Sequence, residues 1–293
     1  MKERTIYALG FFDGVHRGHQ MLLSACRELA DAAGVRAGVV TFTAHPDTLV
    51  LGKTPALINT PQDRKMLLGQ HHMDIVLELP FDRTMMAMPW QEFFQRLREN
   101  YGAAGFVCGE DFRFGYRGEG NSEKLRAACA AEGIPCVVVP QQMLDNQVVS
   151  STYIRALLKD GKMAEAVRFL GHAHVLTGQV VSGKQLGRTI GIPTANLQLP
   201  QGLLTPAFGV YACRVRVEGN TYMAVTNIGT RPTVEGHHVT VEPWLLDFSG
   251  DLYGKELTLE FHAFLRPEKK FPDLEALKAQ IQKDAAQTRA LLG

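Results

Sequence analysis

The chain has 293 residues, 45% of them hydrophobic and 21% charged, values typical of a globular protein that buries a core and is long enough for two domains. Its formal net charge of +1 gives no sign of a nucleic-acid or acidic-membrane partner. The five cysteines are scattered and form no C-x-x-C pair, so we expect reduced thiols without disulfides or zinc. Because we find neither a signal peptide nor an apolar run of membrane length, we expect a cytoplasmic protein that acts on small molecules.

The first half of the chain alternates between apolar strand-like runs and helical segments. We expect helices over about 19–33, 89–101 and 122–132, and a further helix with Thr60 as N-cap and Pro61 as its first residue. Strands that alternate with helices predict a parallel sheet covered on both faces, and hence a doubly wound, Rossmann-like α/β domain. The expected strands are 5–12, 36–42, 74–79, 105–109 and 135–139.

The pattern changes after Gly171. Two short helices, about 152–159 and 162–170, come before the change, and a final helix is expected over about 273–292. The strand-like runs between them alternate or are β-branched and are separated by Gly and Pro, which predicts a compact antiparallel barrel or sandwich, with the barrel preferred. These runs are 175–181, 209–217, 221–229, 239–248 and 256–265. We therefore expect an α/β protein with domains 1–171 and 172–293.

The segment GFFDGVHRGH, residues 10–19, lies where the first strand gives way to a helix. Ligands bind at the carboxyl ends of strands in an open parallel sheet, and a helix N-terminus there presents N–H groups to phosphates. His16 and His19 are three residues apart, so both can face one phosphate group, and Gly18 lets the backbone approach a ligand. This segment predicts a nucleotide site.

Two further segments are expected to complete this site. SSTYIR, residues 150–155, opens a helix with hydroxyls and places Arg155 one turn in, which is suited to clamping phosphates. GEDFRFG, residues 109–115, follows a strand and offers aromatic and charged groups for a base or a flavin ring. Each segment alone is compatible with an ordinary helix cap or turn. Because all three occur together and in order, a functional role is favoured over a purely structural one.

A second site is predicted in the other half of the chain by GRTIGIPTAN, residues 187–196. Thr194 and Asn196 offer a hydroxyl and an amide oxygen to a hard cation, and Mg²⁺ with ATP phosphates is the usual combination. The nearby glycines suit a loop folded over phosphates, with a lysine as a cation, although the Walker pattern is absent. These residues are Gly178, Gly183, Lys184 and Gly187.

Taken together, the motifs resemble those of the prokaryotic bifunctional riboflavin kinase/FMN adenylyltransferase family, also called FAD synthetase, over nearly the whole chain. The resemblance implies that ATP and riboflavin give FMN, that ATP and FMN give FAD and pyrophosphate, and that Mg²⁺ takes part. It assigns His16 and His19 to the triphosphate, and Arg155 with Ser151 and Thr152 to the β- and γ-phosphates. It makes Glu242 the general base of the kinase. Further expected contacts are Phe11, Asp13, Gly18, Gly109 and Asp111 in the adenylyltransferase, and Arg188, Pro193, Asn227, Arg231 and Arg266 in the kinase.

Two departures from the family pattern leave alternatives open. Thr43-Ala44 precedes His45-Pro46 where relatives usually have an acidic residue, which puts adenylyl transfer in question. Pro243-Trp244 follows Glu242, and the proline predicts that this strand lies at an edge or is bulged there. The alternatives are a riboflavin kinase with a degenerate first domain, a flavin-binding regulator without turnover, and a cytidylyl- or pantetheine-type nucleotidyltransferase with an unrelated second domain. The oligomeric state does not follow from the sequence.

Overall fold

The structure is a computed structural model that describes residues 3–182, 191–233 and 236–293. The chain divides into two compact units, the first made of Met1–Leu57 with Pro61–Ser151, and the second of Ile58–Thr60 with Thr152–Gly293. The change between them falls before the division expected after residue 171, because the two short helices ahead of the barrel pack with the second unit. The division at 171 stays a prediction about the functional domains.

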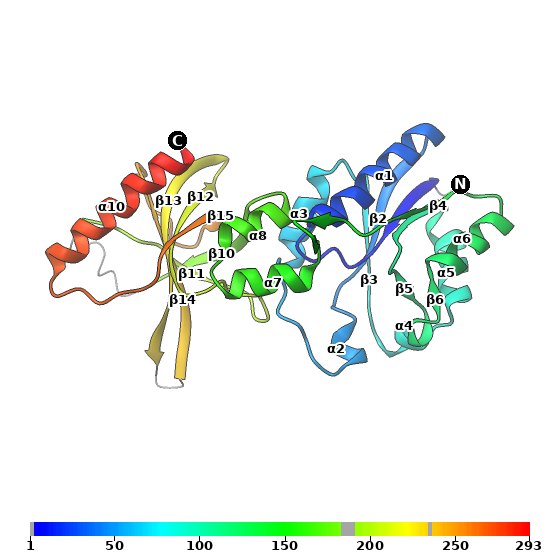
Figure 1. Cartoon of the computed structure of the whole chain (residues 1–293), viewed down its shortest axis with the longest axis horizontal. Helices are drawn as coiled ribbons and strands as arrows, with labels where there is room; N and C mark the ends of the chain where they lie inside the picture. Colours follow the sequence, from blue (N-terminus) through cyan, green and yellow to red (C-terminus); the bar gives the residue numbers. More distant parts are fainter. Residues whose placement is uncertain (1–2, 183–190, 234–235) are drawn as a thin grey trace. The chain divides into compact units, whose positions relative to one another are not determined.

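The first unit is built on a parallel sheet with strand order β3-β2-β1-β4-β7 (Figure 1). Figure 1 shows α1 on one face of the sheet and α5 with α6 on the other, so the predicted doubly wound fold is confirmed. The bounds are β1 (Thr5–Leu9), α1 (Arg17–Ala33), β2 (Arg36–Phe42), α3 (Pro61–Gln70), β3 (Ile75–Leu79), α5 (Trp90–Tyr101), β4 (Ala103–Gly109), α6 (Ser122–Ala131) and β7 (Cys136–Val139).

Short elements in the connections of this unit were not expected from the sequence. They carry few apolar residues in a periodic pattern, so local turn geometry and packing define them. They are α2 (Asp47–Val50), α4 (Arg83–Ala87), β5 (Arg113–Phe114), a 3₁₀ turn (Tyr116–Gly118), β6 (Gly120–Asn121), β8 (Met143–Leu144) and β9 (Gln147–Val148).

Alternation along β1 explains how the sheet is buried on both sides. Tyr7 and Leu9 join the core that α5 and α6 complete, whereas the Cys26 thiol of α1 lies against the backbone of Ile6. Helix α1 ends at Gly34, whose φ of 62° is in the left-handed region and whose N–H closes the last turn. The sheet that carries the motif loops at its strand ends is therefore covered on both faces.

The second unit is a closed antiparallel barrel of order β10-β11-β14-β13-β12-β15. Antiparallel pairing of β10 with β15 closes the ring, so the predicted barrel is confirmed. Helix α10 lies against β12 and β13, and α8 against β10 and β15. The bounds are α7 (Ser151–Lys159), α8 (Met163–Leu170), β10 (His174–Val181), β11 (Asn196–Gln198), β12 (Gly209–Val217), β13 (Asn220–Thr233), β14 (Gly236–Leu245), β15 (Glu256–Arg266) and α10 (Leu274–Leu292).

Pro243 occupies an ordinary position of β14. The strand pairs with β13 in continuous register, with Thr226 opposite Pro243, so neither the expected bulge nor an open edge is found. The Pro243 carbonyl accepts the N–H of Ala195 at 2.9 Å, on the side where β11 pairs with β14 only at Leu197 and Val241. The nitrogen and the carbonyl oxygen of a residue in an antiparallel strand face the same neighbouring strand. The N–H that Pro243 lacks would therefore point toward β11, where few backbone hydrogen bonds are made.

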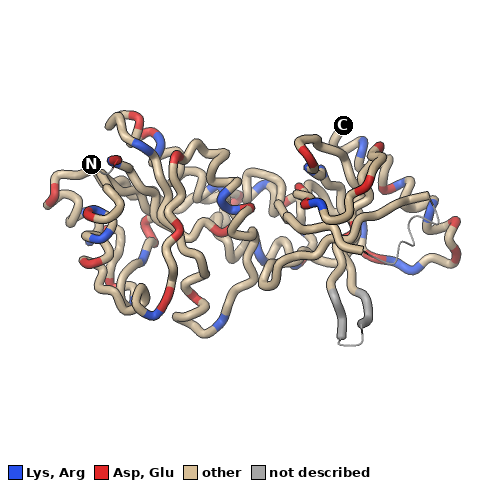
Figure 2. The backbone as a smooth tube through the Cα atoms, turned by 180° about the vertical axis from the view of Figure 1, so that it is seen from behind, with Lys and Arg blue, Asp and Glu red and all other residues tan. Residues whose placement is uncertain are grey.

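The distribution of charged residues agrees with the near-neutral net charge. Lys and Arg are interspersed with Asp and Glu along both units (Figure 2). Within the described ranges, no helix is both long and apolar enough to cross a membrane. All five cysteines are free thiols, and only Cys136 is more than slightly exposed.

Candidate active sites

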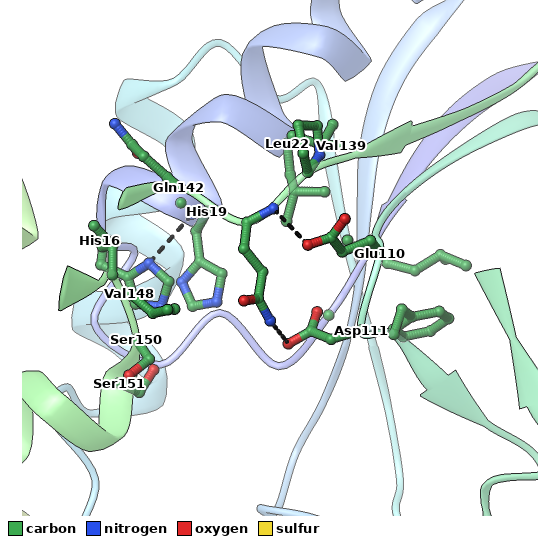
Figure 3. A pocket seen from close by; sticks show the side chains of 18 residues that line it. His16, His19, Leu22, Glu110, Asp111, Val139, Gln142, Val148, Ser150 and Ser151 are labelled. Carbon is green, nitrogen blue, oxygen red and sulfur yellow. Dashed lines mark hydrogen bonds between the residues drawn. The ribbon is translucent and has the colours of Figure 1, made fainter. Parts of the chain in front are cut away.

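A cavity of about 350 Å³ in the first unit lies at the carboxyl ends of β1, β4 and β7 (Figure 3). Strand order reverses between β1 and β4, and this switch point is where open α/β sheets bind ligands. Three predicted segments meet there. The cavity is lined by Leu9, Gly10, His16, Gly18, His19, Leu22, Gly109, Glu110, Asp111, Phe112, Val139, Pro140, Gln141, Gln142, Val148, Val149, Ser150 and Ser151.

The loop between β1 and α1 has an unusual backbone. Phe12 has a φ of 60° and Val15 a φ of 38°, so the chain leaves the sheet at Leu9 instead of extending to residue 12 as expected. Left-handed geometry is costly for a β-branched residue and persists only where the surroundings hold it. Contacts with the rest of the unit therefore hold this loop in one conformation.

Side-chain hydrogen bonds, two of them from residues distant in sequence, hold three carbonyls of this loop. Thr41 Oγ1 donates to the Phe11 carbonyl at 2.9 Å, and Ser151 Oγ donates to the Asp13 carbonyl at 2.8 Å. Gln20 Nε2 donates to the Val15 carbonyl at 2.9 Å. Ser151 thus connects the SSTYIR segment to the nucleotide loop, a contact that the sequence alone did not specify.

His16 and His19 form one wall of the cavity. Their rings stack with centroids 3.6 Å apart and planes 15° apart, and the His16 Nδ1 accepts the backbone N–H of His19 at 3.3 Å. His16 is therefore the N-cap of α1, and its Nε2 carries the proton in the neutral ring. Gly18 makes this fold-back possible, since a Cβ there would lie 3.3 Å from the His16 ring.

The electrostatics keep His19 neutral. Burial, reinforced by the neighbouring His16 and Arg64, holds the pKa of His19 well below its usual range. Its Nδ1 is buried and has no hydrogen-bond partner in the described part of the chain. His19 therefore presents a neutral ring to the cavity, and the N-terminus of α1 adds positive potential beside it.

Arg64 is a buried cation beneath this loop that sequence reasoning missed. The residue is 1% exposed, its Nη2 donates to the Phe42 carbonyl at 2.9 Å, and its guanidinium lies 4.3 Å from the Phe11 ring centroid. Burial lowers the pKa of Arg64, while the carboxylates of Asp13 and Glu78 oppose that shift. A charged residue on the buried face of the predicted helix after Pro61 was the available signal.

Phe11 and Asp13 do not line the cavity but shape its loop. Asp13 is 3% exposed, and the Phe11 ring packs edge-on to His45 at 4.5 Å. Thr152 and Arg155 are placed by the structure on α7 in the second unit, and neither lines this cavity. Their expected contacts with phosphates stay predictions.

A larger and more apolar cavity, of about 860 Å³, lies in the same unit. The end of the GEDFRFG segment forms one side, where the rings of Phe112 and Phe114 stack 5.3 Å apart. Phe42 and Pro46, which flank the Thr43-Ala44 departure, line it as well. Planar aromatic surfaces of this kind suit a flat heteroaromatic ring.

The second unit has a cavity of about 320 Å³ between the barrel and α10. It collects predicted residues from four separate segments, namely Thr194, Asn227, Glu242 and Arg266. Glu268, Lys269 and Phe271 also line it, and they belong to the segment 266–271 that resembles the flavin-side segment of the family. The rest of the lining was not predicted and consists of Ile192, Val210, Val225, Trp244, Leu277, Ile281 and Asp284.

Strand pairing sets Glu242 and Asn227 directly opposite each other on β14 and β13. The Asn227 Nδ2 donates to Glu268 Oε1 at 3.3 Å, so two carboxylates flank one amide in this cavity. Gly229 provides room for Glu268, since a Cβ there would overlap its carboxylate. Trp244, two residues after Glu242 on the same strand face, lines the same cavity.

Other described residues predicted for the kinase do not themselves line this cavity. Gly178 is in β10, where a Cβ would come within 2.8 Å of the Gln198 carbonyl, so strand packing explains this glycine. Pro193 is exposed and Asn196 is the first residue of β11. Arg231 lies in β13, opposite His238. Gly183, Lys184, Gly187 and Arg188 lie outside the described residues.

Comparison with known proteins finds a family model for each part of the chain. A family model described as FAD synthetase matches residues 1–153, and one described as riboflavin kinase matches residues 170–292. The chain belongs to the bifunctional riboflavin kinase/FMN adenylyltransferase family. Proteins of that name are 38% identical in Pseudomonas fluorescens (98% of this chain, 92% of the relative), 36% in Escherichia coli (100% and 94%) and 33% in Listeria monocytogenes (97% and 91%).

The fold has a solved counterpart over the same length. A crystal structure from Streptococcus pneumoniae, described as a macrolide-efflux protein, superimposes with a TM-score of 0.90 at 30% identity, covering 99% of this chain and 95% of that one. The family assignment and this likeness span both units, so neither half is an unrelated addition.

Proposed function

We propose that the first unit transfers the adenylyl group of ATP to FMN and that the second phosphorylates riboflavin with ATP. The observation that carries the proposal is convergence, because each unit gathers predicted motif residues that are far apart in sequence around one cavity. His16, Asp111 and Ser151 meet in the first, and Thr194, Glu242 and Arg266 in the second.

In the first unit, ATP occupies the cavity at the strand ends, with its phosphates against the start of α1. The phosphate oxygen of FMN attacks the α-phosphorus, the bond to the bridging oxygen breaks, and pyrophosphate leaves. The FMN phosphate is already ionised, so positioning and charge stabilisation replace a general base. His16 and His19 donate ring N–H groups to the phosphates, and we assign Arg155, Ser151 and Thr152 to the β- and γ-phosphates.

The aromatic cavity beside GEDFRFG receives the isoalloxazine ring in this proposal. Its volume of about 860 Å³ and its stacked Phe112 and Phe114 support a flat tricyclic ring. Phe42 and Pro46 also contribute, so an acidic residue is not required for an apolar contact with the ring at this place.

In the second unit, Glu242 accepts the proton of the ribityl 5′-hydroxyl while that oxygen attacks the γ-phosphorus of ATP and ADP leaves. Strand β14 fixes the Glu242 backbone opposite Asn227, which limits the directions its carboxylate can take. Arg266 and Trp244 line the remainder of the cavity and are assigned to the flavin side.

The donor set near Thr194 fits Mg²⁺. A hydroxyl and an amide oxygen are hard ligands, and a Mg²⁺ ion bound to ATP needs few protein groups. Thr194 would hold it from the cavity wall, with Asn196 as the second ligand. When bound, the ion neutralises charge on the transferring phosphoryl group. We place this enzyme in the cytoplasm with small-molecule substrates, a reducing compartment being consistent with five free thiols.

Two variants of the full chain test the assignment of each site. We expect Glu242→Gln to lower riboflavin phosphorylation by about 10²- to 10⁴-fold, because that reaction needs a general base. FMN adenylylation, which needs none, should stay intact. We expect His19→Ala to do the reverse. Loss of both activities in either variant, or of neither, would contradict the division of labour.

A further inference from the structure

Asp284 is a buried carboxylate on α10 for which the family motifs give no role. It is 2% exposed, yet it lines the cavity of the second unit. Its spacing places it on the cavity side of α10 with Leu277 and Ile281, seven and three residues before it. Burying an ionised side chain on an apolar helix face costs free energy unless the charge is paired. The residue that pairs with Asp284 therefore indicates what Asp284 does.

That partner is Arg266, the last residue of β15. Arg266 Nε donates to both Asp284 oxygens at 3.1 and 3.0 Å, and Nη2 donates to Oδ2 at 2.7 Å. This is a fork-shaped contact, which fixes the plane of the guanidinium as well as its position. Arg266 is 17% exposed and also lines the cavity.

The same carboxylate organises the segment between β15 and α10. Gln280 Nε2 donates to Asp284 Oδ1 at 2.9 Å, and Gln280 Oε1 accepts Lys269 Nζ at 2.8 Å. Arg266 and Lys269 in turn lie 5.7 and 5.0 Å from the Phe271 ring centroid. Arg266, Lys269 and Phe271 of this segment are thus connected to Asp284, directly or through one residue, whereas Glu268 contacts Asn227.

We propose that Asp284 is a positioning residue of the kinase site, which holds Arg266 and the segment 266–271 in the geometry that receives riboflavin. The proposal rests on the proposed kinase function of this cavity. Asp284 acts through Arg266 and takes no part in proton or phosphoryl transfer. Losing its charge would free the guanidinium to adopt other directions and would leave a buried cation uncompensated.

The chain provides a matched control on the same helix. Arg289 of α10 makes two bonds to Asp247, at 2.6 and 3.0 Å, but Asp247 is 71% exposed and lines neither this cavity nor the others described. Asp247→Asn removes a tether of α10 without touching the pocket. A purely structural role for Asp284 would make the two variants differ only in stability.

The test compares Asp284→Asn, Asp247→Asn and the wild type as full chains, with riboflavin phosphorylation, FMN adenylylation and Tm measured on each. Asp284→Asn is expected to raise KM for riboflavin by about tenfold or more, with a much smaller change in kcat and unchanged adenylylation. Asp247→Asn should leave both activities unchanged.

Three results would overturn the proposal. One is a lower Tm with an unchanged KM for riboflavin in Asp284→Asn. Another is an equal rise in KM in Asp247→Asn, and a third is a fall in kcat alone. A wild type that makes no FMN from riboflavin would instead reject the kinase assignment itself, and the inference with it. Asp284→Glu, which keeps the charge, should recover part of the affinity if Arg266 is what Asp284 positions.

Discussion

His174, the first residue of β10, makes the stability of the second unit depend on acid. Its ring is fully buried, lies 5.8 Å from that of Phe261, and leaves both Nδ1 and Nε2 without a partner in the described part of the chain. Burial, with a smaller contribution from His172, lowers the pKa of His174 to about 3. The perturbation we choose is His174→Leu, which removes the titrating group and fills the same space.

The sign and size follow from linkage. The unfolded chain binds a proton at His174 with a pKa of about 6.5, while the folded unit does not until far lower pH. Stability from the neutral ring is therefore complete above pH 6.5 and declines as the pH falls below it. Because pH 5.0 lies about 1.5 pH units below the unfolded pKa and above the folded one, the free energy of unfolding falls by about 2 kcal/mol from this residue.

The assay is urea unfolding at pH 7.5 and pH 5.0, followed by tryptophan fluorescence. The chain has two tryptophans, so a Trp90→Phe background leaves Trp244 as a reporter of the second unit. Between the two pH values, the wild type should lose about 2 kcal/mol more than His174→Leu. Equal losses in the two proteins would refute the reasoning, because His174 would then be partnered or hydrated in solution.

Three shorter predictions concern the two sites. Ser151→Ala should lower FMN adenylylation about fivefold, because the hydrogen bond from Ser151 to the Asp13 carbonyl is worth about 1 kcal/mol. Riboflavin phosphorylation should stay unchanged, and an equal effect on both activities would contradict this role of Ser151. Gly229→Ala should displace Glu268 from Asn227 and raise KM for riboflavin severalfold without affecting adenylylation, whereas an unaltered KM would remove Glu268 from the account. Chelation with EDTA should stop FMN formation and added Mg²⁺ should restore it; phosphorylation that survives chelation would exclude the cation.

The fold could be predicted from the sequence because its signals are local. Strand 36–42 matched β2 residue for residue, and α10 began within a residue of its expected start. The first strand was predicted too long because Phe11 and Phe12 continue its apolar run, and only the loop's contacts take them out of the sheet. Strand β11 was missed because three residues carry no periodicity.

Some of the site residues could likewise be predicted from the sequence, and others could not. Motifs pointed to His16, His19 and Asp111 because glycines and short spacings carry geometric meaning, whereas Glu242 was expected only from the family resemblance. All four residues line cavities in the structure. Arg64 and Asp284 were missed because a buried charge is recognised only once its partner, distant in sequence, is in place. Lone charges within helices read as solvated residues until packing shows otherwise.

The most direct test of the central claim is to incubate the purified full chain with Mg²⁺, ATP and riboflavin and to resolve the flavins by chromatography over time. Both sites acting in one chain predict that FMN appears first and that FAD follows with release of pyrophosphate. FMN that accumulates without FAD, also when FMN itself is supplied, would contradict the account of the first unit and leave a riboflavin kinase alone.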